Sequence, residues 1–137
     1  MYNYTDPGEC SFEDGLCGYH NSPEDDHFEW TRQNGTTGSI GTGPDADHTL
    51  NNNLGYYMYI EASDPRIEGD MAIFSSPWLR TSDWYDYNCN LTFWYHMKGA
   101  HIGQLDVRET STAYWNKGDH TIWSRNNSNV SFVGTSY

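Results

Sequence analysis

Histidine and carboxylate side chains are the residues of this chain that could carry out acid–base or metal chemistry. Six histidines are scattered along the sequence, and His96 and His101, five positions apart, do not have the spacing of a zinc site. Nineteen Asp and Glu residues form many pairs, so their number alone does not indicate a catalytic pair. No serine-hydrolase, metalloprotease, P-loop or dinucleotide signature occurs. The sequence therefore favours a protein that is not an enzyme.

The three cysteines are the other reactive side chains. Cys10 and Cys17 enclose six residues, and the Glu-Asp-Gly among them can turn the chain back on itself. We predict a disulfide between these two cysteines; the alternative is a pair of buried free thiols in a cytosolic protein. Cys89 is left without a partner in this chain.

The charge of the chain excludes several classes of partner. Nineteen acidic and seven basic residues give a formal net charge of −12, which disfavours binding to nucleic acid and to anionic lipid. No apolar run approaches the roughly 18 residues of a membrane span, so we expect no direct membrane insertion by this segment. Five Asn-x-Ser/Thr sequons give a weak indication of a secreted glycoprotein, at Asn3, Asn34, Asn90, Asn126 and Asn129.

Short alternating stretches, separated by turn residues, are the elements that must position these side chains. The clearest stretch runs from Cys89 to Met97, where Cys89, Leu91, Phe93, Tyr95 and Met97 fall on one face. Shorter stretches of the same kind are Phe28–Arg32, Tyr56–Glu61, Asp70–Phe74, Gly103–Arg108 and Asn129–Val133. Short strands at regular spacing predict an all-β antiparallel sandwich or barrel.

Aromatic rings must supply most of the hydrophobic core. The chain has 6 Trp, 11 Tyr and 5 Phe, and each buried ring removes roughly 150–250 Å² from water. The expected core rings are those of Phe12, Phe28, Trp30, Phe93 and Tyr95. The tract Glu24-Asp25-Asp26 is expected to be a solvated loop.

A series of motifs extends from Cys10 to the end of the chain. It includes Cys10-Ser-Phe-Glu-Asp-Gly-Leu-Cys17, Thr42-Gly-Pro-Asp-Ala-Asp-His-Thr-Leu50, Gly55-Tyr-Tyr-Met-Tyr-Ile-Glu61 and Cys89-Asn-Leu-Thr-Phe-Trp-Tyr-His-Met-Lys-Gly99. In this order the motifs resemble the MAM domain, a family named after meprin, neuropilin and the mu-type receptor tyrosine phosphatase. We therefore expect a lead-in over residues 1–9 and a MAM domain over residues 10–137.

The resemblance implies a jelly-roll-like sandwich of two antiparallel sheets. It also implies four cysteines, paired first with second and third with fourth. This chain departs from that pattern, because no fourth cysteine follows Cys89. We expect the domain to be incomplete at its C-terminus, without its closing strands, as in a fragment of a larger ectodomain.

The resemblance further implies a structural cation near the N-terminal strand. Carried over by position, the candidate ligands for Ca²⁺ or Na⁺ are Glu13, Asp14 and Asp47, and no other cofactor is expected. From the residues alone, Asp47 has a second interpretation, a turn in which its carboxylate accepts backbone N–H groups.

The function that the resemblance implies is a non-catalytic extracellular interaction or adhesion module of a membrane-anchored or secreted multidomain protein. Its partner would be a protein, bound homophilically or heterophilically. The alternatives are a carbohydrate-binding jelly roll and an accessory domain of a secreted metalloprotease. The candidate contact residues are aromatic and lie outside the alternating core positions: Trp78, Trp84, Tyr85 and Tyr87. Their alternative role is packing within loops.

Overall fold

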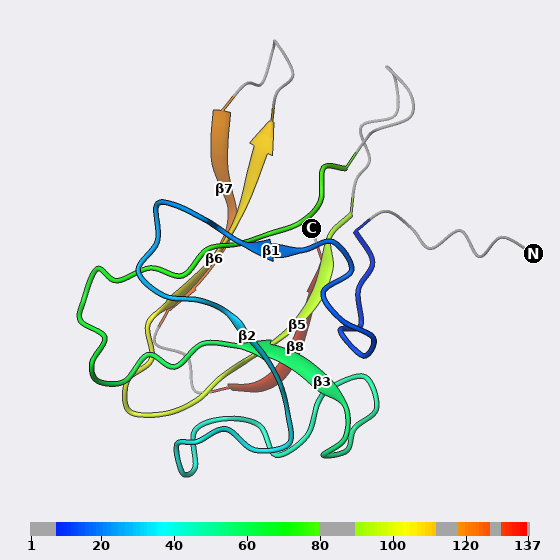
Figure 1. Ribbon diagram of the computed structural model, residues 1–137, viewed down its shortest axis with the longest axis vertical. Helices are drawn as coiled ribbons and strands as arrows, with labels where there is room; N and C mark the ends of the chain where they lie inside the picture. Colours follow the sequence, from blue (N-terminus) through cyan, green and yellow to red (C-terminus); the bar gives the residue numbers. More distant parts are fainter. Residues whose placement is uncertain (1–7, 80–89, 112–117, 127–129, 137) are drawn as a thin grey trace, which may run out of the picture. The chain divides into compact units, whose positions relative to one another are not determined.

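Every regular element in the described residues is a β-strand. The computed structural model describes residues 8–79, 90–111, 118–126 and 130–136 (Figure 1). The strands are β1 (His20–Asn21), β2 (Thr31–Asn34), β3 (Tyr56–Tyr59), β4 (Phe74–Ser75), β5 (Thr92–Met97), β6 (Gln104–Ser111), β7 (Gly118–Asn126) and β8 (Val130–Ser136). The predicted all-β antiparallel fold is confirmed. In this part of the chain there is no helix that could cross a bilayer.

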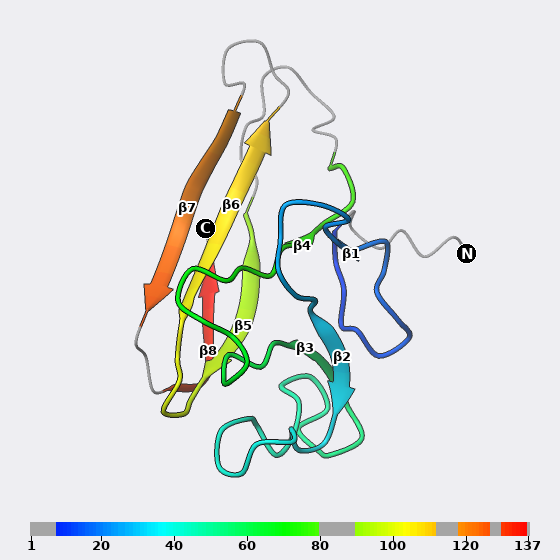
Figure 2. The same ribbon diagram turned by 60° about the vertical axis from the view of Figure 1, so that its left-hand side comes forward.

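The chain divides into two compact units. Unit 1 comprises Met1–Gly38 and Pro44–Asn88, and unit 2 comprises Ser39–Gly43 and Cys89–Tyr137. In unit 1, β1 pairs with β4 and β2 with β3; in unit 2, β5 pairs with β8 and β6 with β7. All four pairs are antiparallel. The yellow and orange hairpin of β6 and β7 is the longest of them (Figure 2).

A cluster of aromatic rings forms the apolar centre of unit 1. The Tyr19 ring stacks on Phe74 with centroids 5.4 Å apart, and Phe12 meets Tyr19 edge-on at 5.9 Å. The Trp30 ring lies 6.2 Å from Phe74, and its Nε1 donates a hydrogen bond to the Ala72 carbonyl at 3.0 Å. The cluster therefore contains the predicted Phe12 and Trp30, together with two rings that were not predicted.

In unit 2, the two sheets face each other through three rings. Trp123 of β7 meets Phe93 and Tyr95 of β5 edge-on, with centroids 5.2 and 5.0 Å apart. Tyr95 is only 5% exposed, and its hydroxyl accepts a hydrogen bond from Arg125 Nε at 3.1 Å. The prediction that Phe93 and Tyr95 share an inward face is confirmed, and unit 2 is a two-layer sandwich.

Strand β7 was not predicted, because its sequence does not alternate. The pairing of β6 with β7 shifts register between Val107 and Arg108, where Ile122 is the extra residue of a bulge. Apart from the exposed Ile122, the outward residues of β7 are polar, and the two apolar residues Ile122 and Trp123 are adjacent, so no period of two is visible.

The predicted strand Asp70–Phe74 is wrong for most of its length, since only Phe74 lies in a strand. The Met71 and Ile73 carbonyls accept the backbone N–H groups of His27 and Ser22, but side chains accept the N–H groups of the same two residues. Met71 N–H donates to His27 Nδ1 at 3.0 Å, and Ile73 N–H donates to Asp26 Oδ2 at 3.0 Å. In the tract predicted to be a solvated loop, Glu24 and Asp25 are exposed as expected, whereas Asp26 is half-buried and hydrogen-bonded.

The Phe28 ring also differs from its prediction. It lies beneath the Arg66 guanidinium, 4.5 Å from ring centroid to Cζ, and no ring–ring contact with the cluster of unit 1 is seen among the described residues. The predicted strand Phe28–Arg32 begins three residues later, at Thr31.

Candidate functional site

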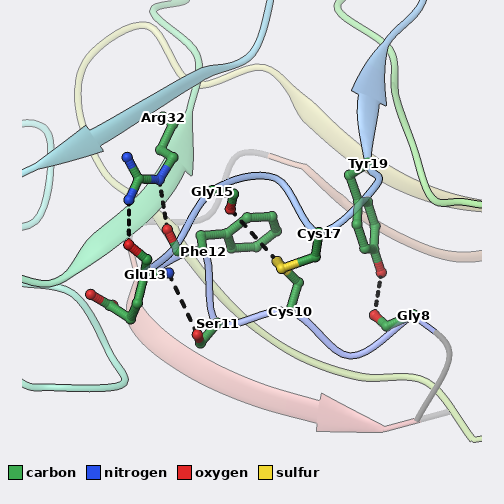
Figure 3. Close-up of a disulfide and its surroundings, with 9 residues drawn as sticks. All are labelled: Gly8, Cys10, Ser11, Phe12, Glu13, Gly15, Cys17, Tyr19 and Arg32. Carbon is green, nitrogen blue, oxygen red and sulfur yellow. Dashed lines mark hydrogen bonds between the residues drawn. A yellow bond between two sulfur atoms is a disulfide. The ribbon is translucent and has the colours of Figure 1, made fainter. Parts of the chain in front are cut away.

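The predicted disulfide between Cys10 and Cys17 is present (Figure 3). The loop that it closes turns at Phe12 and Gly15, both of which have positive φ angles, of 65° and 135°. Just outside the loop, the Tyr19 hydroxyl donates to the Gly8 carbonyl at 2.7 Å, and burial raises the pKa of this phenol. Cys89 lies outside the described residues, so its unpaired state stays a prediction.

Arg32 fastens the disulfide loop to strand β2. Its Nε donates to the Phe12 carbonyl and its Nη2 to the Glu13 carbonyl, each at 2.6 Å (Figure 3). The same guanidinium lies over the Tyr56 ring of β3, 3.4 Å from the centroid. A planar group with several donors is needed to make these three contacts at once.

Glu13 joins the same loop to strand β3. Its Oε1 accepts the backbone N–H of Tyr56 at 3.0 Å, at the first residue of that strand. Asp14, the next residue, is exposed. Glu13 and Asp14, two of the three predicted cation ligands, therefore lie in different environments.

Asp47 organises the loop that precedes β3. It is 1% exposed, and its two carboxylate oxygens accept the N–H groups of Leu50 at 2.8 Å and Asn52 at 3.4 Å. Its own N–H donates to the Asn52 carbonyl at 3.2 Å. Gly55 packs directly against the carboxylate, and a Cβ there would overlap with it. The interpretation of Asp47 as a turn residue that accepts backbone N–H groups is confirmed.

A second side chain completes this loop. Asn52 Oδ1 accepts the N–H groups of Leu54 at 2.8 Å and Gly55 at 3.2 Å. We call residues 47–55 the Asp47 loop. Its backbone is held by two side chains because short Asp and Asn side chains readily substitute for backbone acceptors in turns.

The three predicted cation ligands do not form a ready-made metal centre. Within the described residues, no group of three or more His, Cys, Asp or Glu side chains is arranged to hold a metal ion. Glu13 and Asp47 each use carboxylate oxygens to accept backbone N–H groups of different residues. The cation site stays a prediction.

Of the four predicted contact residues, the structure describes Trp78, which is 72% exposed. Trp84, Tyr85 and Tyr87 lie outside the described residues. Leu50 and Leu54 of the Asp47 loop are also exposed, and the sequence did not single them out.

Three of the five sequon asparagines are described, and all are exposed: Asn34, Asn90 and Asn126. The other two, Asn3 and Asn129, lie outside the described residues. Glycosylation of all five stays a prediction.

Comparison with known proteins gives the family. Residues 10–131 match the family "MAM domain, meprin/A5/mu". The MAM domain-containing glycosylphosphatidylinositol anchor protein 1 of Gallus gallus is 42% identical over an alignment length of 112, which covers 77% of this chain and 11% of that protein. The human protein of the same name is 40% identical over an alignment length of 139, which covers 90% of this chain and 14% of the relative.

A relative with a different name shows the same degree of similarity. Thyroid hormone-induced protein B of Xenopus laevis is 38% identical over 119 residues, which cover 87% of this chain and 16% of that protein. The chain thus spans less than one fifth of the length of these three relatives. The family match covers most of the chain and includes the Cys10–Cys17 loop, the Asp47 loop and β5. The chain therefore belongs to the MAM domain family.

Proposed function

We propose that this chain is a non-catalytic, extracellular interaction module of a membrane-anchored protein, with a role in cell adhesion or in the assembly of receptor ectodomains. The observation that carries the proposal is the family match over residues 10–131. The names of two relatives describe glycosylphosphatidylinositol anchor proteins, which supports a place on the outer face of the plasma membrane. The disulfide agrees with an oxidising compartment.

The geometry supports binding rather than catalysis. Glu13 accepts a backbone N–H of β3, and the buried Asp47 holds its loop together. Each of these carboxylates thus has a structural partner in the backbone. The function we propose depends on complementary surfaces.

A carbohydrate-binding module is the second candidate. The observation that favours it is Trp78, whose ring is 72% exposed and is followed by the exposed Leu79. Exposed indole rings are suited to stacking on apolar faces of ligands. Protein binding remains our first proposal, because it also accounts for exposed leucines, which offer a sugar no stacking face.

One experiment separates the two candidates. Beads coated with the chain are scored for clustering, for binding to purified ectodomains and for binding to a glycan panel. Trp78→Ala and, as a control with a similarly exposed apolar side chain, Ile67→Ala are measured beside the wild type. Binding to protein without binding to glycans is the expected result. Saturable glycan binding that Trp78→Ala abolishes, with no protein binding, would establish the carbohydrate module instead.

A further inference from the structure

The Asp47 loop presents two leucines to solvent. Leu50 is 50% exposed and Leu54 is 69% exposed, although both are among the more apolar side chains of the chain. Single exposed leucines are common on protein surfaces. Here two exposed leucines lie four positions apart on one nine-residue loop.

The backbone beneath both leucines is held in place. Leu50 N–H donates to the Asp47 carboxylate, and the Leu50 carbonyl accepts from Asn52 Nδ2 at 3.3 Å. Leu54 N–H donates to Asn52 Oδ1. Asp47 itself is almost completely buried. A surface whose backbone is already ordered loses less conformational entropy when it binds a partner.

The unit that contains this loop is strongly negative. Unit 1 contains 16 acidic and 3 basic residues, a formal net charge of −13, whereas unit 2 contains 3 acidic and 4 basic residues, a net charge of +1. Asp14 and Asp45, both exposed, belong to unit 1. Two of its three basic side chains are already engaged, Arg32 with Tyr56 and Arg66 with Phe28. Unit 1 therefore complements a positively charged surface.

A second copy of this chain is a poor match for the same loop. It would bring either another unit of net charge −13, which repels unit 1, or a unit of net charge +1, which attracts it little. Building on the proposed function, we infer that the Asp47 loop docks on a basic surface of a different protein, with Leu50 and Leu54 entering an apolar pocket of that partner.

The test uses the whole chain against an array of individually purified extracellular domains that range from acidic to basic, with this chain included as one of them. We expect binding to basic domains. Leu50→Ala and Leu54→Ala should each raise Kd about tenfold, because each removes apolar area that the complex buries. Ile67→Ala, which truncates another exposed side chain of unit 1, should leave Kd unchanged. Raising the salt concentration should slow association.

The outcomes distinguish this inference from the proposed function on which it rests. Binding to other domains that neither leucine variant weakens, or binding only between copies of this chain, overturns the inference and leaves the proposed function standing. Failure to bind any domain of the array overturns both. Melting curves of the leucine variants, expected to match the wild type because the side chains are exposed, show that a loss of binding is not a loss of fold.

Discussion

At Gly55 the chain has no room for a side chain. A Cβ at this position would overlap with the buried Asp47 carboxylate, which cannot move without giving up the N–H groups of Leu50 and Asn52. We predict that Gly55→Ala lowers the free energy of unfolding by about 1–3 kcal/mol, the usual range for overpacking. Urea denaturation of the two proteins measures the difference.

Gly38→Ala is the matched control for this prediction. Nothing lies within 4 Å of a Cβ at Gly38, and its φ is outside the positive range in which side chains are strained. We expect it to change stability by less than about 1 kcal/mol, in the stabilising direction, because alanine restricts the unfolded chain. Equal stability of the two alanine variants would contradict the role given to Asp47.

Tyr57 contributes stability that is lost at high pH. Its hydroxyl donates to the Gly35 carbonyl at 2.6 Å, and burial, followed by the nearby Tyr59 and Asp45, raises its pKa. A phenol whose pKa is higher in the folded state contributes stability that is complete below its unfolded pKa of about 10 and is lost as pH rises through the folded value.

We therefore predict that the Tm falls as the pH rises above about 10, the unfolded value, and that it falls less in Tyr57→Phe. The variant should start from a lower Tm at neutral pH, because it lacks the hydrogen bond to Gly35. Thermal melts in a series of alkaline buffers measure both effects. Parallel curves for the two proteins would argue against Tyr57 as a source of the alkaline loss.

Among the elements, the disulfide loop and the β2–β3 pair depend on Arg32. Lysine keeps the charge but cannot donate to the Phe12 and Glu13 carbonyls from a planar group that also lies over Tyr56. We predict that Arg32→Lys lowers the free energy of unfolding by about 1–2 kcal/mol, measured by urea denaturation.

Arg108→Lys provides the comparison. Arg108 pairs with Asp119 at 2.7 Å on the surface of the β6–β7 hairpin, where both side chains are about half exposed. Such pairs contribute little, so we expect a change of less than about 0.5 kcal/mol. If the two lysine variants are equally stable, the contacts of Arg32 do not fix the loop as we describe.

Local patterns predicted those elements whose contacts are close in sequence or regularly spaced. The disulfide spans seven positions, Asp47 binds backbone groups within five, and β5 alternates between exposed and more buried residues from Thr92 to Tyr95. The sequence did not indicate Arg32, because its partners are backbone carbonyls about twenty positions away, and any residue has a carbonyl. For the same reason, the bonds from Met71 and Ile73 to His27 and Asp26, more than forty positions away, could not be foreseen.

In the molecule as a whole, the negative charge is concentrated in unit 1. Salt screens the repulsion among like charges. The Tm should therefore rise when the NaCl concentration is increased from about 10 mM to about 150 mM. The predicted cation site adds a second effect. Calcium at the same ionic strength should raise the Tm further. At a calcium concentration of ten times Kd, the free energy of unfolding should increase by about 1.4 kcal/mol.

Asp14 gives the sharper variant for this prediction, because it is exposed and lies next to the hydrogen-bonded Glu13. Asp14→Asn should reduce the additional calcium effect, whereas Asp25→Asn, which removes an exposed carboxylate elsewhere in unit 1, should preserve it. Melting temperatures that depend on ionic strength alone, or that respond identically in the two variants, would rule out the predicted ligands.

The segment Ser39–Gly43 belongs to unit 2, although the chain on both sides of it belongs to unit 1. Its Thr42 carbonyl forms a hydrogen bond with His96 Nε2 at 2.9 Å. A ribosome synthesises this segment about fifty residues before the strand that it contacts. During translation, Ser39–Gly43 therefore cannot form its contact with His96 until β5 has been synthesised. Residues 89–137 expressed as a separate fragment would lack this part of their own unit.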